Sequence, residues 1–422
     1  MSPFELSVLC FLQIVVILTV CRVVGWLTSF IGQPQVVGEM IAGVMLGPSL
    51  FGWLAPGAQA ALFPAASKPI LYTASQLGLV LYMFLVGLEF DIRLVRSRMK
   101  CAGAVSLSGI IAPFMLGCAL AYMVMGNRGF FSPKVLPLEA MFFTGAAMSI
   151  TAFPMLARIV HERGLTGTSL GTLALAAGSL DDGAAWCVLA LVLTSFSGDP
   201  AIALLAIGGG TLYFIVTLTA GSRAFKYLGR IAERQGVGSS LLTVTLILVM
   251  AGAWFTDRIG IYAVFGAFIM GVAMPKGIFA MEVQRQIEPV TVNLLLPLFF
   301  VYSGLNTRIT LIDRPELILI ALVVLAAACM GKGVACWGAA LITGEENRTA
   351  LGIGALMNAR GLMELIILNI GLERGVITPL FFTVMVLMAI LTTLMATPVF
   401  KWVYGDRKEA PIPMAMASSS PG

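Results

Sequence analysis

Long apolar stretches recur along the whole chain, and they constrain its fold more than any other feature. Of the 422 residues, 59% are hydrophobic and 11% are charged, whereas a soluble protein would have roughly 25% charged residues. The stretches are continuous and do not alternate with a period of two, which disfavours a β-barrel. The sequence therefore predicts an all-α polytopic membrane protein, because helices satisfy their own backbone hydrogen bonds in lipid.

Polar residues and Gly/Pro positions divide these stretches into about thirteen candidate transmembrane helices. Most have the length of about 20 residues that is needed to cross the hydrocarbon core. The first one lacks a basic leader and a small-residue cleavage site, so we expect it to be retained rather than to be a signal peptide. The predicted segments are 6–28, 35–53, 70–90, 102–126, 138–158, 169–196, 200–221, 239–255, 260–275, 289–305, 316–342, 350–371 and 379–403.

Basic residues predict the orientation of these segments in the membrane. If the N-terminus lies outside, most of the 26 lysines and arginines fall in inward-facing segments, among them Arg22, Arg163 and Arg230. The positive-inside rule therefore favours an outside N-terminus and a cytoplasmic C-terminus. We expect 1–404 to form a single transmembrane domain and 405–422 to be a short disordered cytoplasmic tail.

The short loops and the few cysteine and histidine residues disfavour several function classes. The loops leave no room for a nucleotide-binding domain, so ATP-driven transport is not expected. The seven cysteines show no metal-type spacing, and the one histidine leaves little scope for a histidine-based metal site. We expect no cofactor, no nucleic-acid partner and no enzymatic activity.

Two adjacent aspartates, Asp181 and Asp182, lie at the centre of the sixth predicted segment. A charged side chain at the centre of a spanning helix costs about 2.5–3.5 kcal/mol on insertion scales, so the pair needs a reason. Adjacent residues of a helix point about 100° apart. One aspartate can therefore face a cavity while the other faces a neighbouring helix, where Lys332 is the natural partner. The alternative is a purely architectural charge pair.

A membrane-embedded carboxylate of this kind can hold either a proton or a small hard cation, but not readily both. If access to the site alternates between the two sides, this competition is sufficient for cation/proton exchange. Two other classes stay open: an ion channel, which needs no coupling, and a Na⁺-coupled organic-anion symporter. Arg360 and Glu364, four residues apart on the twelfth segment, form either a helix-stabilising pair or a support for the site.

Two predicted helices carry helix-breaking residues beside polar ones. In the fifth segment Ser149 and Thr151 precede Pro154, which removes a backbone donor. In the twelfth segment Asn358 lies among glycines that include Gly361. Segments two to six and nine to thirteen form two five-helix blocks of opposite orientation, in which these two broken helices correspond. Matched broken helices are typical of transporter binding sites, so we expect Ser149, Thr151 and Asn358 to line the site.

At these residues the chain resembles the monovalent cation:proton antiporter-2 family. This family includes bacterial sodium/proton and Kef-type antiporters and plant cation/proton exchangers. The stretches that carry the resemblance are QPQVVGEMIAGVMLGPSLFG (33–52), LYMFLVGLEFD (81–91), MSITAFPMLARIV (148–160), GSLDDGAAW (178–186), PLFFVYSGLNT (297–307), MGKGVACW (330–337) and LMNARGLMELIILNIG (356–371).

The resemblance implies an inverted-repeat fold with crossed discontinuous helices in a moving core domain. The core would comprise helices of about 102–196 and 316–403, and the remaining helices would form the dimerisation scaffold. It also implies that Asp182 is the ion- and proton-binding carboxylate. Asp181 would pair with Lys332, as in the electrogenic sodium/proton branch. The Kef-type branch carries a Gln–Asp motif, which this chain does not, and several stretches are closer to the plant exchangers.

The resulting hypothesis is a homodimeric secondary antiporter of a bacterial inner membrane. It would exchange Na⁺, or alternatively K⁺, for H⁺ at Asp182 by elevator-like motion of the core. Asp181 and Lys332 would form an ion pair that forms and breaks as the ion occupancy of the site changes. The only metal bound by Asp181 and Asp182 would be the transported cation. Arg360 and Glu364 would support this site.

Overall fold

The computed structural model describes residues 2–89, 99–126, 129–165, 168–178, 180, 181, 184, 200–259 and 263–405. Within these ranges the regular secondary structure is helical, apart from one isolated β-bridge between Phe131 and Ile377. Eight of the described helical segments are long and apolar enough to cross a membrane. The prediction of an all-α polytopic membrane protein is confirmed.

The helices follow the apolar stretches of the sequence. In chain order they are α1 (Pro3–Ser29), α2 (Gln35–Leu46), α3 (Phe51–Leu54), α4 (Pro56–Leu62), α5 (Lys68–Glu89), α7 (Met99–Val124), α8 (Pro137–Ser149), α9 (Phe153–Glu162), α11 (Pro200–Val216), α12 (Ser222–Gln235), α13 (Ser239–Arg258), α14 (Ala263–Ala273), α15 (Ile278–Val290), α16 (Leu296–Leu305), α17 (Pro315–Cys329), α18 (Ala335–Ile342), α19 (Asn347–Met357), α20 (Leu362–Glu373) and α21 (Pro379–Tyr404). A further apolar helix covers Ser169–Gly178. Short π-helical segments join α11 to α12 (Thr217–Gly221), α15 to α16 (Thr291–Leu295) and α17 to α18 (Met330–Val334).

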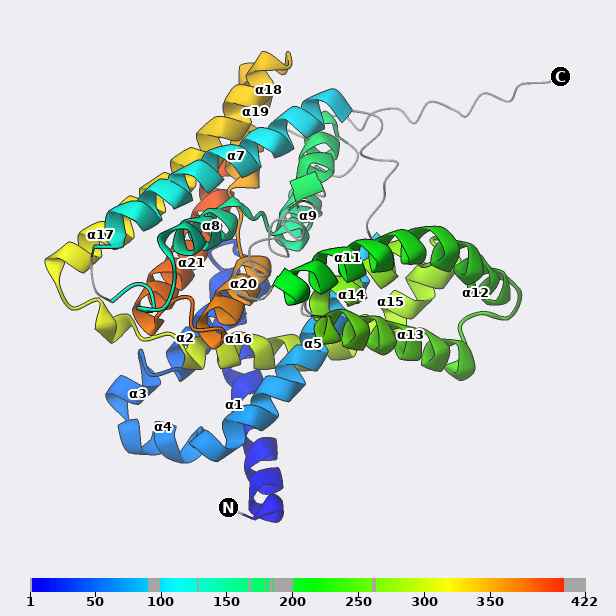
Figure 1. Cartoon of the computed structure of the whole chain (residues 1–422), viewed down its shortest axis with the longest axis horizontal. Helices are drawn as coiled ribbons and strands as arrows, with labels where there is room; N and C mark the ends of the chain where they lie inside the picture. Colours follow the sequence, from blue (N-terminus) through cyan, green and yellow to red (C-terminus); the bar gives the residue numbers. More distant parts are fainter. Residues whose placement is uncertain are drawn as a thin grey trace.

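The helices form two groups that lie side by side. Figure 1 shows the green helices α11 to α15 together on one side and α7 to α9 with α17 to α21 on the other. In the first group α14 packs against α5 and α13. In the second group α7 packs against α8 and α18, and α21 packs against α17, α19 and α20. Helix α16 packs on both α2 and α5.

Most predicted segments correspond to helices, and the segment predicted over 35–53 corresponds to a candidate span over Gln35–Leu54, but it is not one continuous helix. Helix α2 ends at Leu46, and Gly47 adopts an extended conformation. Gly47 precedes Pro48, whose ring disfavours helical backbone for the residue before it. The chain then forms the short helices α3 and α4, of which the second was not predicted.

Two other predicted boundaries were wrong because a helix continued past its apolar part. The segment predicted to end at residue 221 runs on without interruption into α12, which carries four basic residues. The segment predicted to begin at residue 289 already begins at Ile278, where polar residues such as Glu282 and Arg285 hid it. Hydropathy marks where a helix is apolar, whereas backbone hydrogen bonding continues through its polar turns.

Glycines bring several backbones into direct contact around α2. A Cβ atom on Gly304 of α16 would overlap the carbonyl of Gly43, and one on Gly38 would lie against Gly25 of α1. Small residues at helix crossings allow close packing in membranes, where apolar burial alone does not drive association. Helix α2 also contacts the second group, because Val37 packs with Ala152 and Met155. Of these residues, Ala152 lies between α8 and α9, and Met155 lies in the first turn of α9.

Candidate ion site at two crossed helix breaks

Both helices that were predicted to be broken are broken in the structure. Helix α8 ends at Ser149, the next residue Ile150 is extended, and α9 begins at Phe153. Helix α19 ends at Met357, and α20 begins at Leu362 after a short non-helical stretch. Each break leaves backbone carbonyls and N–H groups without helical partners.

The two breaks meet each other in space. The backbone N–H of Ala152 donates to the carbonyl oxygen of Ala359 at 3.3 Å. Gly361 has a φ of +155°, which favours glycine. A Cβ atom at this position would lie 3.2 Å from the Met155 side chain. The discontinuous helices therefore cross at their interruptions, which brings the free ends of four half-helices to one place.

Asp181 lies at this crossing and is completely buried. Its Oδ2 accepts a hydrogen bond of 2.5 Å from Thr151 Oγ1 and lies 3.3 Å from Lys332 Nζ. Ser106 of α7 lies beside the same carboxylate. The other oxygen, Oδ1, has no hydrogen-bond partner among the described residues. The ion pair that was expected between Asp181 and Lys332 is therefore present, and one carboxylate oxygen has no described donor.

Lys332 connects the carboxylate to the end of α8. Its ammonium group, also fully buried, donates to the carbonyl oxygen of Ser149 as well as pairing with Asp181. It lies in the π-helical segment between α17 and α18, with glycines on both sides. A Cβ atom at Gly331 would lie 2.8 Å from Leu116 and 3.3 Å from Pro113. The glycine therefore lets this segment approach α7 closely.

Arg360 satisfies the carbonyl groups at the end of α8 that Lys332 does not reach. Its Nη2 donates to the oxygen of Met148 at 2.8 Å and its Nη1 to that of Ala147 at 3.5 Å. Nη1 also lies 3.5 Å from the Glu364 carboxylate. Two buried cations thus face the negative end of the α8 dipole, where positive charge is favourable. The expected pair of Arg360 and Glu364 exists within the second broken helix, and Arg360 also reaches across to the first.

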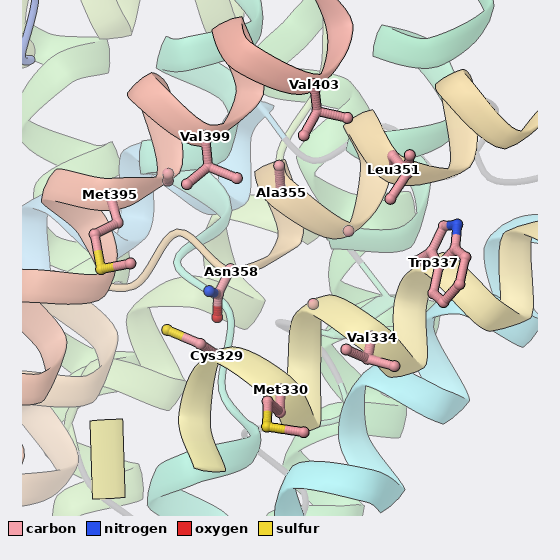
Figure 2. Close-up of a pocket in the computed structure, with 13 residues that line it drawn as sticks. Cys329, Met330, Val334, Trp337, Leu351, Ala355, Asn358, Met395, Val399 and Val403 are labelled. Atoms are coloured by element: carbon pink, nitrogen blue, oxygen red, sulfur yellow. The ribbon is translucent and has the colours of Figure 1, made fainter. Parts of the chain in front are cut away.

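Asn358 lies in a different place from the carboxylate. It points into an apolar cavity of about 260 Å³ that it shares with Cys329, Met330 and Val399 (Figure 2). Its Oδ1 has no hydrogen-bond partner among the described residues. No hydrogen bond joins Asn358 to Asp181, so the structure does not bring these two predicted residues together.

The remaining predicted residues have distinct positions. The Ser149 hydroxyl donates to the Ala146 carbonyl within its own helix at 2.9 Å, so only the backbone oxygen of Ser149 faces Lys332. Asp182 lies outside the described residues.

Sequence reasoning missed two residues that hold the site together. Ser106 lies beside the Asp181 carboxylate, and Thr393 exchanges hydrogen bonds with the backbone of Arg360. Hydroxyl residues are common in membrane helices, so nothing in the sequence distinguished these two.

A membrane protein with two crossed, interrupted helices and a buried ion pair at their crossing has the architecture of a secondary transporter. Residues 15–404 match the family model described as "Sodium/hydrogen exchanger, transmembrane". The chain belongs to this family. It is therefore a cation/proton antiporter of a membrane and not an enzyme, and the resemblance expected from the sequence is confirmed.

Individual relatives agree with this assignment. The chain is 42% identical over 400 residues to the Na(+)/H(+) antiporter NhaS4 of Synechocystis sp., which covers 93% of this chain and 96% of that protein. It is 32% identical over 411 residues to the K(+)/H(+) antiporter 1 of Saccharomyces cerevisiae. That alignment covers 93% of this chain and 46% of the yeast protein. The chain spans about half the length of the plant and yeast relatives that it matches.

A solved structure has a similar fold. The sodium proton antiporter MjNhaP1 from Methanocaldococcus jannaschii matches with a TM-score of 0.61 and 13% sequence identity. The match covers 95% of this chain and 98% of that one.

Proposed function

We propose that this protein exchanges a monovalent cation, Na⁺ in the first place, for H⁺ at the Asp181–Asp182 pair. The observation that carries the proposal is the position of Asp181 at the crossing of the two breaks. There the carboxylate is held by Thr151 and Lys332 and keeps one oxygen without a described donor. Half-helix ends supply partial charges that offset a bound ion, and a carboxylate accepts either a cation or a proton.

The proposed roles divide the aspartate pair. Asp182 binds the transported cation and the proton alternately. Asp181 and Lys332 form an ion pair in this structure. We propose that this ion pair breaks when Asp182 binds or releases its cation or proton. Thr151 and the carbonyl end of α8 would line the site, and Arg360 with Glu364 would hold that end in place. Asn358 is retained as a site residue because its amide oxygen, at the start of the second break, has no described donor.

The proposed transport cycle uses the two groups of helices. Helices of about 102–196 and 316–403 would form a core that moves against the remaining helices in an elevator-like manner, and two copies would form a homodimer. The correspondence of the broken helices supports two inverted five-helix repeats within about thirteen spans. We place the protein in a bacterial inner membrane with the N-terminus outside, on the loop charges.

K⁺/H⁺ exchange is the second candidate. The similarity to a yeast protein named as a K(+)/H(+) antiporter favours it, whereas the similarity to a protein named as a Na(+)/H(+) antiporter over nearly its full length favours Na⁺.

The decisive experiment measures proton flux in proteoliposomes under an imposed pH gradient, with Na⁺, K⁺ or Li⁺ added in turn. We expect Na⁺ to dissipate the gradient in the wild-type protein and not in the Asp182→Asn variant. Asp257→Asn, an exposed position on α13, is the matched control and should behave as the wild type. Cation flux without proton flux would instead indicate a channel, and near-native activity of Asp182→Asn would overturn the assignment of the carboxylate.

A further inference from the structure

A polar pocket of about 490 Å³ lies where α1 turns into α2. It shares no residue with the ion site, and its walls come from the end of α1, from the turn and from the residue that follows α9. The residues that matter for its chemistry are Arg22, Trp26, Ser29, Gln33, Gln35 and Arg163.

Two guanidinium groups border this pocket, and its described lining residues include no carboxylate. Arg22 donates to the side-chain oxygen of Gln35 at 3.1 Å, and Arg163 extends over Gly32. No acidic residue lines the pocket, and neither arginine forms a salt bridge within the described part of the chain. The pocket is therefore a concave surface with positive charge on two sides.

The position of Arg22 is set by hydrogen bonds and not by an opposite charge. Gln35 accepts from Arg22 and donates through Nε2 to the Glu39 carboxylate at 2.8 Å. Gln33 donates to the carbonyl of Leu394 at 2.9 Å, which holds the turn against α21. These bonds orient the walls of the pocket before any ligand binds.

Aromatic residues place the mouth of the pocket at the membrane surface. Trp26 is 59% exposed and Phe30 is 70% exposed, and their rings pack edge to face with centroids 4.7 Å apart. Tryptophan at the end of a spanning helix is typical of the headgroup region. A basic pocket between transmembrane helices at this depth is suited to a lipid headgroup.

We infer that this pocket binds a phosphate group between Arg22 and Arg163, supplied by an anionic phospholipid headgroup or by free phosphate. Arginine is the side chain that pairs best with phosphate, since its planar group donates two parallel hydrogen bonds. The Trp26–Phe30 pair would lie against the glycerol and upper acyl region of a lipid ligand. The ligand would contact both α1 and the segment after α9, which are distant in sequence.

The test is a titration of the purified full-length protein in detergent, followed by tryptophan fluorescence. The probes are short-chain phosphatidylglycerol, phosphatidylcholine of the same chain length and inorganic phosphate. We expect phosphatidylglycerol to bind, and Arg22→Gln and Arg163→Gln each to weaken it by about tenfold, as expected for a lost charged hydrogen bond. Arg258→Gln removes an exposed arginine of α13 and should leave the affinity unchanged.

The phosphate arm separates the two sources of the ligand. If inorganic phosphate competes with phosphatidylglycerol, the pocket is a site for free phosphate. If it does not compete, the ligand is the lipid headgroup. Equal affinity for the two lipids, or wild-type affinity in both arginine variants, would overturn the inference. This titration measures binding and not transport, so its result can be interpreted even if the proposed transport activity is not found. The Asp182→Asn variant should bind phosphatidylglycerol as the wild type does.

Discussion

The guanidinium of Arg360 donates to the backbone carbonyl of Met148 at 2.8 Å, from one broken helix to the other. Arg360 belongs to the break between α19 and α20, whereas Met148 lies in the last turn of α8. Together with the bond from Lys332 to Ser149, this contact gives the open end of α8 a fixed set of cationic partners. The site is therefore built as much by positive side chains as by the carboxylate.

Removal of Arg360 is expected to destabilise the protein strongly. Arg360→Met leaves the buried Glu364 carboxylate without its partner, and breaking a buried ion pair in this way costs about 3–5 kcal/mol. The thermal unfolding midpoint in detergent should fall clearly, whereas Arg308→Met at an exposed position should not change it. Adding Glu364→Gln to Arg360→Met should restore part of the loss. No difference between the two arginine variants would show that this pair is not structural.

The Asp181–Lys332 pair should show strong coupling in a double-mutant cycle. Asp181→Asn and Lys332→Met each leave one buried charge alone, while the double variant leaves none. We expect the double variant to be more stable than the sum of the single effects, by about 0.5–3 kcal/mol. Thermal unfolding of all four proteins measures the coupling energy. Additive effects would mean that the 3.3 Å contact makes no energetic contribution.

The hydroxyl of Thr151 should matter for cation binding, and that of Ser149 should not. Thr151→Val keeps the shape of the side chain but removes the 2.5 Å hydrogen bond to Asp181. A bond to a charged group contributes about 1.5–3 kcal/mol, so the apparent cation affinity should change by roughly tenfold or more. Ser149→Ala removes a hydroxyl that bonds only within its own helix and is the control. The dependence of proton flux on cation concentration measures the apparent affinity of both variants. Equal effects of Thr151→Val and Ser149→Ala would contradict the different roles of the two hydroxyl groups.

The crossing of α2 and α16 should not tolerate a single added methyl group. Gly304→Ala would push its Cβ into the backbone of Gly43, and overpacking of this kind costs typically about 1–3 kcal/mol. Gly103→Ala on α7 meets no atom within 4 Å and is the matched control. There alanine should be neutral or stabilise the helix by about 0.5–1 kcal/mol. Comparison of the unfolding midpoints in detergent decides the matter, and equal midpoints would disprove the backbone contact.

Much of the fold could be predicted, because hydropathy and helix-breaking residues act locally. Helices α1, α5 and α21 begin and end within a few residues of their predicted limits, and both breaks occur where Pro154 and the glycines around Asn358 indicated them. The errors arose where a helix continued through polar turns, as α12 does after the apolar part ends. Composition does not report backbone continuity, which depends on hydrogen bonds.

The site was only partly predictable, because its decisive contacts are formed between distant segments. The pair of Asp181 and Lys332 could be expected, since two buried opposite charges need each other. The carbonyl contacts of Arg360 and the position of Ser106 could not, because they depend on how α7, α8 and α19 pack. For the same reason Asn358, a polar residue at a break, was expected beside the carboxylate and instead faces an apolar cavity.

The bond between Ala152 and Ala359 has a mechanical consequence. Sliding either interrupted segment along its own axis by one residue, about 1.5 Å in a helix, would take that amide away from its acceptor. This bond therefore opposes independent sliding of the two interrupted segments, whereas a joint displacement of both would keep it intact. Arg360 would move with these segments, whereas Lys332 lies on the neighbouring segment between α17 and α18.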